Sequence, residues 1–195
     1  MLFLGVLFGL YTAAVVYALG SFLEERFPHE ETPFYTAFFS SAGVEEAVKF
    51  LFLFFLIWGN RNFNEPLDGI VYGVFVSLGF AWAENVIYVT HPILGGYETA
   101  FARALLSVPG HGLFGVRMGY YFALGKYRSR KRYLPLAFFS PYLAHALYNY
   151  FLLKREPVFW LFFSVLEARL WVFGLKRIKE LQNCSPFREK VSKES

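Results

Sequence analysis

Long uncharged apolar runs constrain this chain more than any other feature of its sequence. Between charged or turn-forming residues, these runs reach the roughly 20 residues that an α-helix needs to cross a bilayer. Of the 195 residues, 56% are hydrophobic and only 17% are charged, a composition that excludes an ordinary water-soluble domain and a disordered chain. Six candidate spans lie between the breaks, at residues 2–20, 34–58, 67–89, 101–124, 133–153 and 157–174.

These spans predict an all-α fold, a polytopic integral membrane helical bundle of about six transmembrane helices. Most of the 19 Lys and Arg residues fall at one end of that bundle, chiefly in the cluster from Lys126 to Arg132 and in the segment that begins at Lys176. By the positive-inside rule, both termini are expected to be cytoplasmic. Residues 1–180 are predicted to form a single transmembrane domain and residues 181–195 a basic cytoplasmic tail. The expected location is a prokaryotic cell membrane, crossed several times.

The formal net charge of +4 also suggests nucleic-acid binding, but the positions of the basic residues do not. They lie where topology signals lie, so contact with anionic lipids of the bilayer is predicted and no nucleic-acid partner is expected. The single cysteine, Cys184, excludes an intrachain disulfide and a cysteine-based metal site. Glu167 and Arg169, inside the last span, have no explanation in the sequence.

Ionisable side chains occur inside four successive predicted spans. A charge in the bilayer interior is unfavourable unless it faces the bundle or a water-filled cavity, so such residues are functional candidates. Each helical residue rises 1.5 Å, which places Glu45, Glu84, His111 and His145 between about 8 and 16 Å from the outer ends of their spans. Because the four groups share a similar depth on different helices, we expect them to form one site.

Helical spacing indicates which of these side chains face inward. Ser41, Glu45 and Lys49 are four residues apart and share one face of their helix, whereas Glu46 is rotated by about 100°. Glu45 is therefore the favoured inward carboxylate. The Pro109–Gly112 run is predicted to break its helix at the histidine that it contains, and the freed backbone groups require a wet pocket there.

This set of side chains fits hydrolysis. A glutamate takes a proton from water, a histidine protonates the leaving amine, and an amide such as that of Asn149 donates to the developing oxyanion. The chain has no G-x-S-x-G elbow and no cysteine within a span, so a covalent nucleophile is not expected. The predicted catalytic residues are Glu45, Glu46, Glu84, His111, His145 and Asn149.

Charge balance indicates what else the site must hold. Three glutamates face a single lysine among the buried candidates. Arg103 and Arg117 are expected to lie too far from His111 to balance the excess negative charge. Either protons or a cation must therefore compensate.

The two forms of compensation predict two kinds of site. In one, Zn²⁺ is held by Glu84, His111 and His145, with one position open for water and with Glu45 or Glu46 as the base. In the other, no metal binds and one or two carboxyl groups stay protonated. The residues leave both alternatives open.

Five motifs resemble, in order, those of the PrsW family of intramembrane proteases. They are EEAVK at 45–49, LDGIVYG at 67–73, GFAWAENVIY at 79–88, HGLF at 111–114 and HALYN at 145–149. Each motif is weak alone, but five in order across four predicted spans are specific, and they cover roughly residues 40–150. PrsW proteins are similar in turn to type II CAAX prenyl endopeptidases, which have a histidine where this chain has Glu84. Processing of prenylated proteins is therefore not expected.

The resemblance implies a transmembrane protease domain whose double glutamate, Glu84 and histidines are needed for activity. It implies membrane-protein substrates cut near the outer face, with membrane-anchored anti-sigma factors as candidates in bacteria. It leaves a zinc metalloprotease and a metal-independent glutamate enzyme both open. The predicted function is therefore intramembrane endopeptidase. A proton-coupled transporter and an inactive scaffold that binds membrane helices are the alternatives.

Overall fold

The computed structural model describes residues 11, 14–16, 18–19, 22, 32–90, 96–128 and 131–187. Most of the first predicted span and the end of the predicted tail lie outside the described residues. In the described part, every regular element is helical, which confirms the all-α prediction. The elements are α2 (Pro33–Tyr35), η1 (Thr36–Gly43), α3 (Val44–Phe52), η2 (Leu53–Ile57), α4 (Pro66–Thr90), α5 (Tyr97–Leu105), α6 (Ser107–Tyr127), α7 (Tyr133–Lys154) and α8 (Pro157–Asn183).

The first four of these elements follow one another without a break and correspond to the predicted span 34–58. Thr32 caps the start, because its side-chain oxygen accepts a hydrogen bond of 3.2 Å from the backbone N–H of Tyr35. Pro33 occupies the first turn, where its missing N–H breaks no helical bond. The two η segments are π-helical turns on either side of α3. Such turns frequently lie at functional sites.

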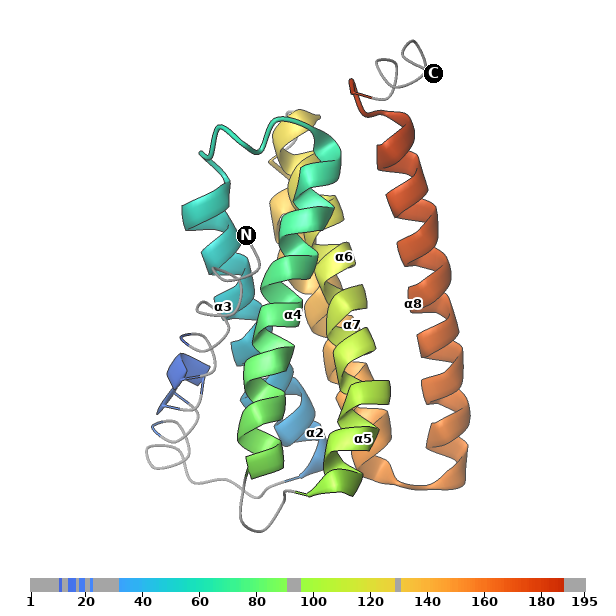
Figure 1. Ribbon diagram of the computed structural model, residues 1–195. Helices are drawn as coiled ribbons and strands as arrows, with labels where there is room; N and C mark the ends of the chain where they lie inside the picture. Colours follow the sequence, from blue (N-terminus) through green and yellow to red (C-terminus); the bar gives the residue numbers. More distant parts are fainter. Residues whose placement is uncertain are drawn as a thin grey trace.

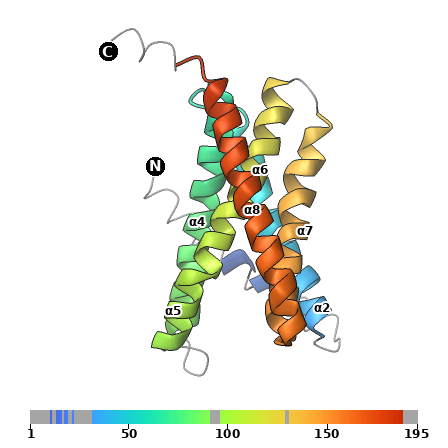
Figure 2. The ribbon, with the colours of Figure 1, turned by 90° about the vertical axis from the view of Figure 1, so that its right-hand side faces the viewer.

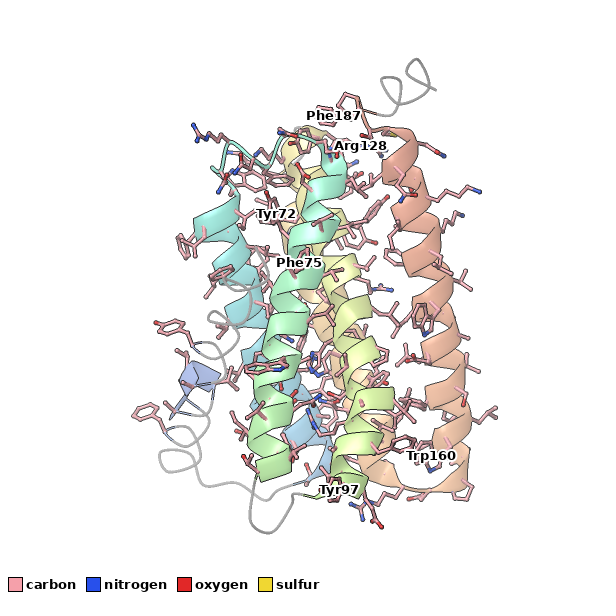
Figure 3. The ribbon with its side chains drawn as sticks, viewed as in Figure 1. Tyr72, Phe75, Tyr97, Arg128, Trp160 and Phe187 are labelled. Carbon is pink, nitrogen blue, oxygen red and sulfur yellow. The ribbon has the colours of Figure 1, made fainter. Side chains whose placement is uncertain are left out.

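Figure 1 shows α4, α6 and α7 at the centre of a bundle, with α3 on one side and α8 on the other. The most extensive contact is between α4 and α6, and α8 packs on α7, α6 and α4. Arg128 and Phe187 lie at one end of the bundle, and Tyr97 and Trp160 lie at the other (Figure 3). We call these the Arg128 end and the Tyr97 end.

Glycines allow α4 and α6 to pack very closely. Gly69 and Gly73 on α4 lie against Gly115 and Gly119 on α6. A Cβ atom added to Gly119 would lie 2.1 Å from the carbonyl oxygen of Gly69, and one added to Gly73 would lie 2.4 Å from that of Gly115. Small residues at this spacing let helix backbones approach each other in membranes. The contact fixes the register of α4 against α6, and this register decides which of their side chains meet further along.

The fourth predicted span, 101–124, is two helices rather than one. α5 ends at Leu105 and α6 begins at Ser107, with Leu106 at a φ of −109° between them. The predicted break at His111 is wrong, because α6 is continuous from Ser107 to Tyr127. Pro109 lies in the first turn of α6, where proline disrupts a helix least.

The remaining helices follow the predicted spans, with one extension. α4 and α7 agree with the predicted spans 67–89 and 133–153 to within a residue at each end. α8 continues to Asn183, well past residue 174 and into the predicted tail. Two helices in the described part are long and apolar enough to cross a membrane by length and composition, Pro66–Thr90 and Pro157–Asn183. The six-span topology and the cytoplasmic termini stay predictions.

Candidate active site

Four ionisable side chains from three helices meet inside the bundle. They are Glu45 and Glu46 of α3, His111 of α6 and His145 of α7. All four are buried, and one nitrogen or oxygen atom of each lies within 4.8 Å of those of the others. We call these residues the Glu–His cluster. It contains four of the six predicted catalytic residues, drawn from parts of the chain up to 100 residues apart.

A buried lysine contacts three of the four residues of this cluster. Nζ of Lys49 lies 2.8 Å from Oε1 of Glu46 and 3.6 Å from Oε2 of Glu45. It also lies 3.1 Å from Nδ1 of His111 and 4.3 Å from the ring centre of Phe80. The sequence places Lys49 one helical turn after the double glutamate, but its contact with His111 depends on the packing of α3 against the rest of the bundle.

His145 is held at both of its ring nitrogens. Nδ1 lies 2.9 Å from Oε1 of Glu46, which can only accept, so the hydrogen-bond pattern assigns a proton to Nδ1. Nε2 then accepts a hydrogen bond of 3.1 Å from the side-chain amide of Asn149. The ring stacks on Phe114 with 4.6 Å between the ring centres. This hydrogen-bond pattern is that of a neutral imidazole. Its Nε2 also lies 3.9 Å from Oε2 of Glu45.

Two further hydrogen bonds join Asn149 to Glu45. The amide of Asn149 donates to Oγ of Ser41 over 2.9 Å, and the hydroxyl of Ser41 donates to Oε1 of Glu45 over 2.9 Å. Both amide hydrogens of Asn149 are therefore used within the protein, on Ser41 and on His145. In this arrangement Asn149 orients the imidazole and Ser41 orients the carboxylate.

Glu84 contacts the ring nitrogen of His111 that faces away from Lys49. Its Oε2 is 3.0 Å from Nε2 of His111 and 2.7 Å from Nη2 of Arg103. His111 therefore donates from Nε2 and keeps Nδ1, the nitrogen that faces Lys49, as an acceptor. The expectation that Arg103 lies too far away to balance charge is wrong. The break at Leu106 lets α5 pack against α4, and this brings Arg103 to Glu84.

Three additional contacts fix the guanidinium of Arg103. Nε donates to Oδ1 of Asn85 over 2.7 Å, and Nη2 donates to Oγ of Ser107 over 3.1 Å. The guanidinium carbon lies 4.1 Å from the ring centre of Tyr88. Because Nε, Nη2 and one face of the guanidinium are engaged, Arg103 holds Glu84 in one position.

A cavity of about 320 Å³ lies beside the Glu–His cluster. Thr36, Tyr88 and Leu153 line it, and each belongs to the part of its helix nearest the Tyr97 end, so the cavity lies between the cluster and that end. A pocket at His111 is therefore present as predicted, although the helix is unbroken there. Its polar lining includes Ser41, Glu84, Arg103, His111, His145 and Asn149.

The donors of the Glu–His cluster suit a divalent cation such as zinc. Carboxylate and imidazole groups are zinc ligands, and Oε2 of both Glu45 and Glu46 is buried without a hydrogen-bond partner. A buried carboxylate oxygen without a donor is unfavourable unless a cation or water satisfies it. The cluster differs from the predicted ligand set, because Glu84 is engaged by Nε2 of His111 and by Arg103 while the two other glutamates face the histidines.

A model of the PrsW family, described as PrsW family intramembrane metalloprotease, matches residues 1–173. This chain belongs to the PrsW family. It is 41% identical to Protease PrsW of Geobacillus kaustophilus over 152 residues, which cover 76% of this chain and 65% of that relative. Identity to Protease PrsW of Oceanobacillus iheyensis is 39% over 181 residues, or 92% of this chain and 80% of the relative. Identity to Protease PrsW of Bacillus subtilis is 37% over 154 residues, which cover 77% of this chain and 68% of that relative.

No solved structure gives a significant match to this chain. PrsW family proteases are membrane proteins, so the bundle is that of a membrane protein. The family match thus confirms the motif resemblance. The chain spans just under two thirds of the length of the Geobacillus relative. Two site residues were not among those predicted to be catalytic. Lys49 was singled out by its spacing to the double glutamate but was given no catalytic role, whereas Arg103 has no local signal because its position depends on the break at Leu106.

Proposed function

We propose that this PrsW family member is an intramembrane endopeptidase that hydrolyses peptide bonds of membrane-protein substrates with water activated by glutamate and histidine. The observation that carries this proposal is the buried Glu–His cluster beside a cavity with polar lining, in a member of a protease family. General acid–base catalysis needs a base and an acid within reach of one water molecule. Glu45 and His145 meet this requirement, since Oε2 of the glutamate is 3.9 Å from Nε2 of the histidine.

Each side chain then has a specific role. Glu45 takes the proton of the attacking water at Oε2, because Oε1 is occupied by Ser41. Glu45 then passes this proton to Nε2 of His145, 3.9 Å away, and the ring transfers it from Nε2 to the leaving amine, while Glu46 holds the ring through Nδ1. We assign Asn149 to positioning rather than to the oxyanion, since both of its amide hydrogens are in use.

Glu84 and Arg103 act through His111. Glu84 accepts from Nε2 of His111 and so directs Nδ1 of that ring toward the cluster. A carboxylate behind a metal-binding or catalytic histidine fixes its tautomer and ring orientation in this way. Arg103 keeps that carboxylate in place.

The donors fit a zinc ion held by Glu45, Glu46, His111 and His145. When bound, zinc supplies Lewis-acid polarisation of the scissile carbonyl and of the attacking water. The contact between Lys49 and Nδ1 of His111 favours the second candidate, a metal-independent glutamate enzyme, because the ammonium already satisfies the nitrogen that a metal would need. The metal content of the purified protein separates the two candidates.

The location of the cavity supports a substrate class. It lies toward the Tyr97 end, which is the outer side in the predicted topology with six spans and cytoplasmic termini. A peptide bond within a transmembrane helix is shielded by helical hydrogen bonds, so the cleaved segment must unwind before hydrolysis. Membrane-anchored anti-sigma factors in a prokaryotic cell membrane are our candidates. The basic segment of residues 181–195 is proposed to lie in the cytoplasm.

Cleavage of a transmembrane reporter by the detergent-purified protein tests this function. We expect Glu45→Gln and His145→Ala to lower the cleavage rate by about 10²- to 10⁴-fold, the usual contribution of general acid–base catalysis. Glu98→Gln is the matched control, because Glu98 is an exposed glutamate on α5. A reporter that binds wild type and Glu45→Gln equally but is never cut would favour the scaffold. Proton flux into vesicles without cleavage would favour the transporter.

A further inference from the structure

Two arginines lie near the middle of their helices, away from the Glu–His cluster. Arg117 is ten residues from either end of α6, and Arg169 is twelve residues from the start of α8 and fourteen from its end. Arg117 donates from Nε and Nη2 to Oγ of Ser140, over 3.0 and 2.7 Å. Arg169 is exposed, and its charge acts on Arg117. Ionisable groups at such a depth in a membrane protein are rare and mark functional sites.

The two guanidinium groups have no acidic partner among the described residues. No carboxylate in those ranges forms an ion pair with Arg117 or Arg169. Glu167, two residues before Arg169, accepts a hydrogen bond from Trp171 through Oε1, and its Oε2 is buried. Two neighbouring cations without an acid repel each other in a medium of low dielectric constant. A negatively charged group from another molecule would remove that repulsion.

Both arginines line one groove between α7 and α8, with a volume of about 550 Å³. Figure 2 shows the two helices spreading apart from their connecting turn toward the Arg128 end, with α6 behind α8. Leu143 of α7 and Val165 of α8 line the groove and are exposed. The groove is therefore open at the lateral surface of the bundle, where a membrane protein meets lipid or another membrane protein.

The positive charge lies inside the groove, with apolar side chains on both sides of it. Leu136 and Phe139 continue the lining beyond Ser140 toward the Arg128 end, and Leu147 and Phe151 continue it toward the connecting turn. From Leu136 to Phe151 the groove follows α7 for about 22 Å. This length is most of the roughly 30 Å hydrocarbon core of a bilayer. An apolar helix with one acidic residue along its length matches this pattern, whereas a lipid headgroup would lie among apolar side chains.

We propose that this groove binds a transmembrane helix of another membrane protein, and that an acidic residue within that helix pairs with Arg117 and Arg169. Charge complementarity selects this occupant, because ionisable side chains inside a membrane pair with one another. A second copy of the described helices offers no suitable acid, since the carboxylates at comparable depth, Glu84 and Glu167 among them, are already bonded or buried. The apolar run at residues 2–20 contains no acidic residue.

The groove follows a different face of α7 from the cavity beside the Glu–His cluster. Leu143 and Leu147 line the groove, whereas His145 and Asn149 line the cavity. The partner helix would therefore bind outside the site proposed for hydrolysis. This assignment also gives a role to Arg169, a charged residue inside a predicted span.

Binding of a labelled transmembrane peptide to the full chain in detergent tests this proposal. The probe is a Leu/Ala helix of about 20 residues with one aspartate near its centre, and the comparison peptide has asparagine there. We expect wild type to bind the aspartate peptide about tenfold more tightly, within the range of single polar contacts between transmembrane helices. Arg169→Gln should lower this preference by about fivefold, and Arg117→Gln/Arg169→Gln should remove it. Arg169→Lys, which keeps the charge, should retain most of it.

Lys176→Gln is the matched control. Lys176 is an exposed base on the same face of α8 two turns later, beyond the groove, so its loss should leave the preference unchanged. The proposal fails if wild type binds the two peptides equally, or if Lys176→Gln lowers the preference as much as Arg169→Gln does. It also fails if moving the aspartate by about 10 Å, or two helical turns, leaves the preference intact, because the acid would then not reach the arginines.

A lipid in place of the helix would give another result. If dioleoyl phosphatidylglycerol removes the preference for the aspartate peptide and dioleoyl phosphatidylcholine does not, an anionic lipid occupies the arginines and the proposal is wrong. Because the measurement is binding and both arginines lie outside the Glu–His cluster, these results do not depend on the proposed protease activity.

Discussion

Nζ of Lys49 lies 3.1 Å from Nδ1 of His111, and both side chains are buried. A buried ammonium is tolerated only where its N–H groups meet acceptors. Glu45 and Glu46 complete the environment of Lys49, at 3.6 and 2.8 Å. The lysine therefore offsets the charge of the double glutamate and connects α3 to α6.

Replacing Lys49 tests this role. Lys49→Met should destabilise the protein by about 3–5 kcal/mol, because it leaves the buried glutamates without their cation. Thermal and denaturant unfolding in detergent would measure the loss. The double variant Lys49→Met/Glu46→Gln should recover much of the stability, since it removes one uncompensated charge. Unchanged stability of Lys49→Met would show that the glutamates are not ionised together.

Arg103 should act on catalysis by positioning Glu84. We expect Arg103→Gln to lower kcat for a transmembrane reporter by about 10- to 100-fold, the usual effect of losing a residue that orients a site histidine. KM should change little if the substrate does not touch Arg103. Arg103→Lys should be intermediate, because it keeps a charge but loses the fork that binds Glu84 and Asn85 together.

Arg61→Gln is the control for that experiment, since Arg61 is exposed in the loop before α4. Cleavage by Arg103→Gln at the wild-type rate would exclude a positioning role. A change in KM alone would instead indicate a direct contact between Arg103 and substrate.

Zinc content should follow the Glu–His cluster. Glu45→Gln, Glu46→Gln and His145→Ala are expected to lower stoichiometric zinc, because these residues lie within ligand distance of one another. Glu84→Gln should keep most of its zinc and lose activity through the orientation of His111. Elemental analysis of the purified variants measures the metal directly. Loss of zinc from Glu84→Gln equal to that from Glu45→Gln would favour the ligand set expected from the sequence.

A second outcome would identify the metal-independent enzyme. If the purified wild type contains no zinc and cleaves its reporter after treatment with a chelator, the cluster works with Lys49 as its only buried cation. In that case Lys49→Met/Glu46→Gln should cleave the reporter much more slowly than Glu46→Gln alone.

The glycine contact between α4 and α6 predicts position-specific effects of alanine. Gly119→Ala should destabilise the protein by about 1–3 kcal/mol, because the new Cβ atom would overlap the backbone of Gly69. Gly112→Ala, on the same helix, meets only Leu78 at 3.6 Å and should be neutral or slightly stabilising. Unfolding in detergent compares the two variants. Equal stability of both would show that α4 and α6 can move apart without cost.

The hydrophobic pattern predicted α4 and α7 well. The limits of α4 and α7 follow from apolar runs bounded by turn-forming residues, and such runs are local properties of the chain. The motifs likewise indicated the family. The break at Leu106 was not predicted, because the Pro109–Gly112 run is a stronger local signal for a break yet is absorbed in the first turn of α6.

The sequence by itself predicted that the double glutamate, Glu84 and the two histidines face the interior of the bundle, since ionisable side chains in apolar runs avoid lipid. Only the tertiary structure decided how they pair. The close glycine packing of α4 on α6 sets Glu84 against His111, and the break at Leu106 brings Arg103 to Glu84. The packing of α7 against α3 brings His145 to Glu46, which Lys49 of the same helix also contacts. Helical spacing gives the face and depth of a side chain, but the register and rotation of one helix against another decide which atoms touch.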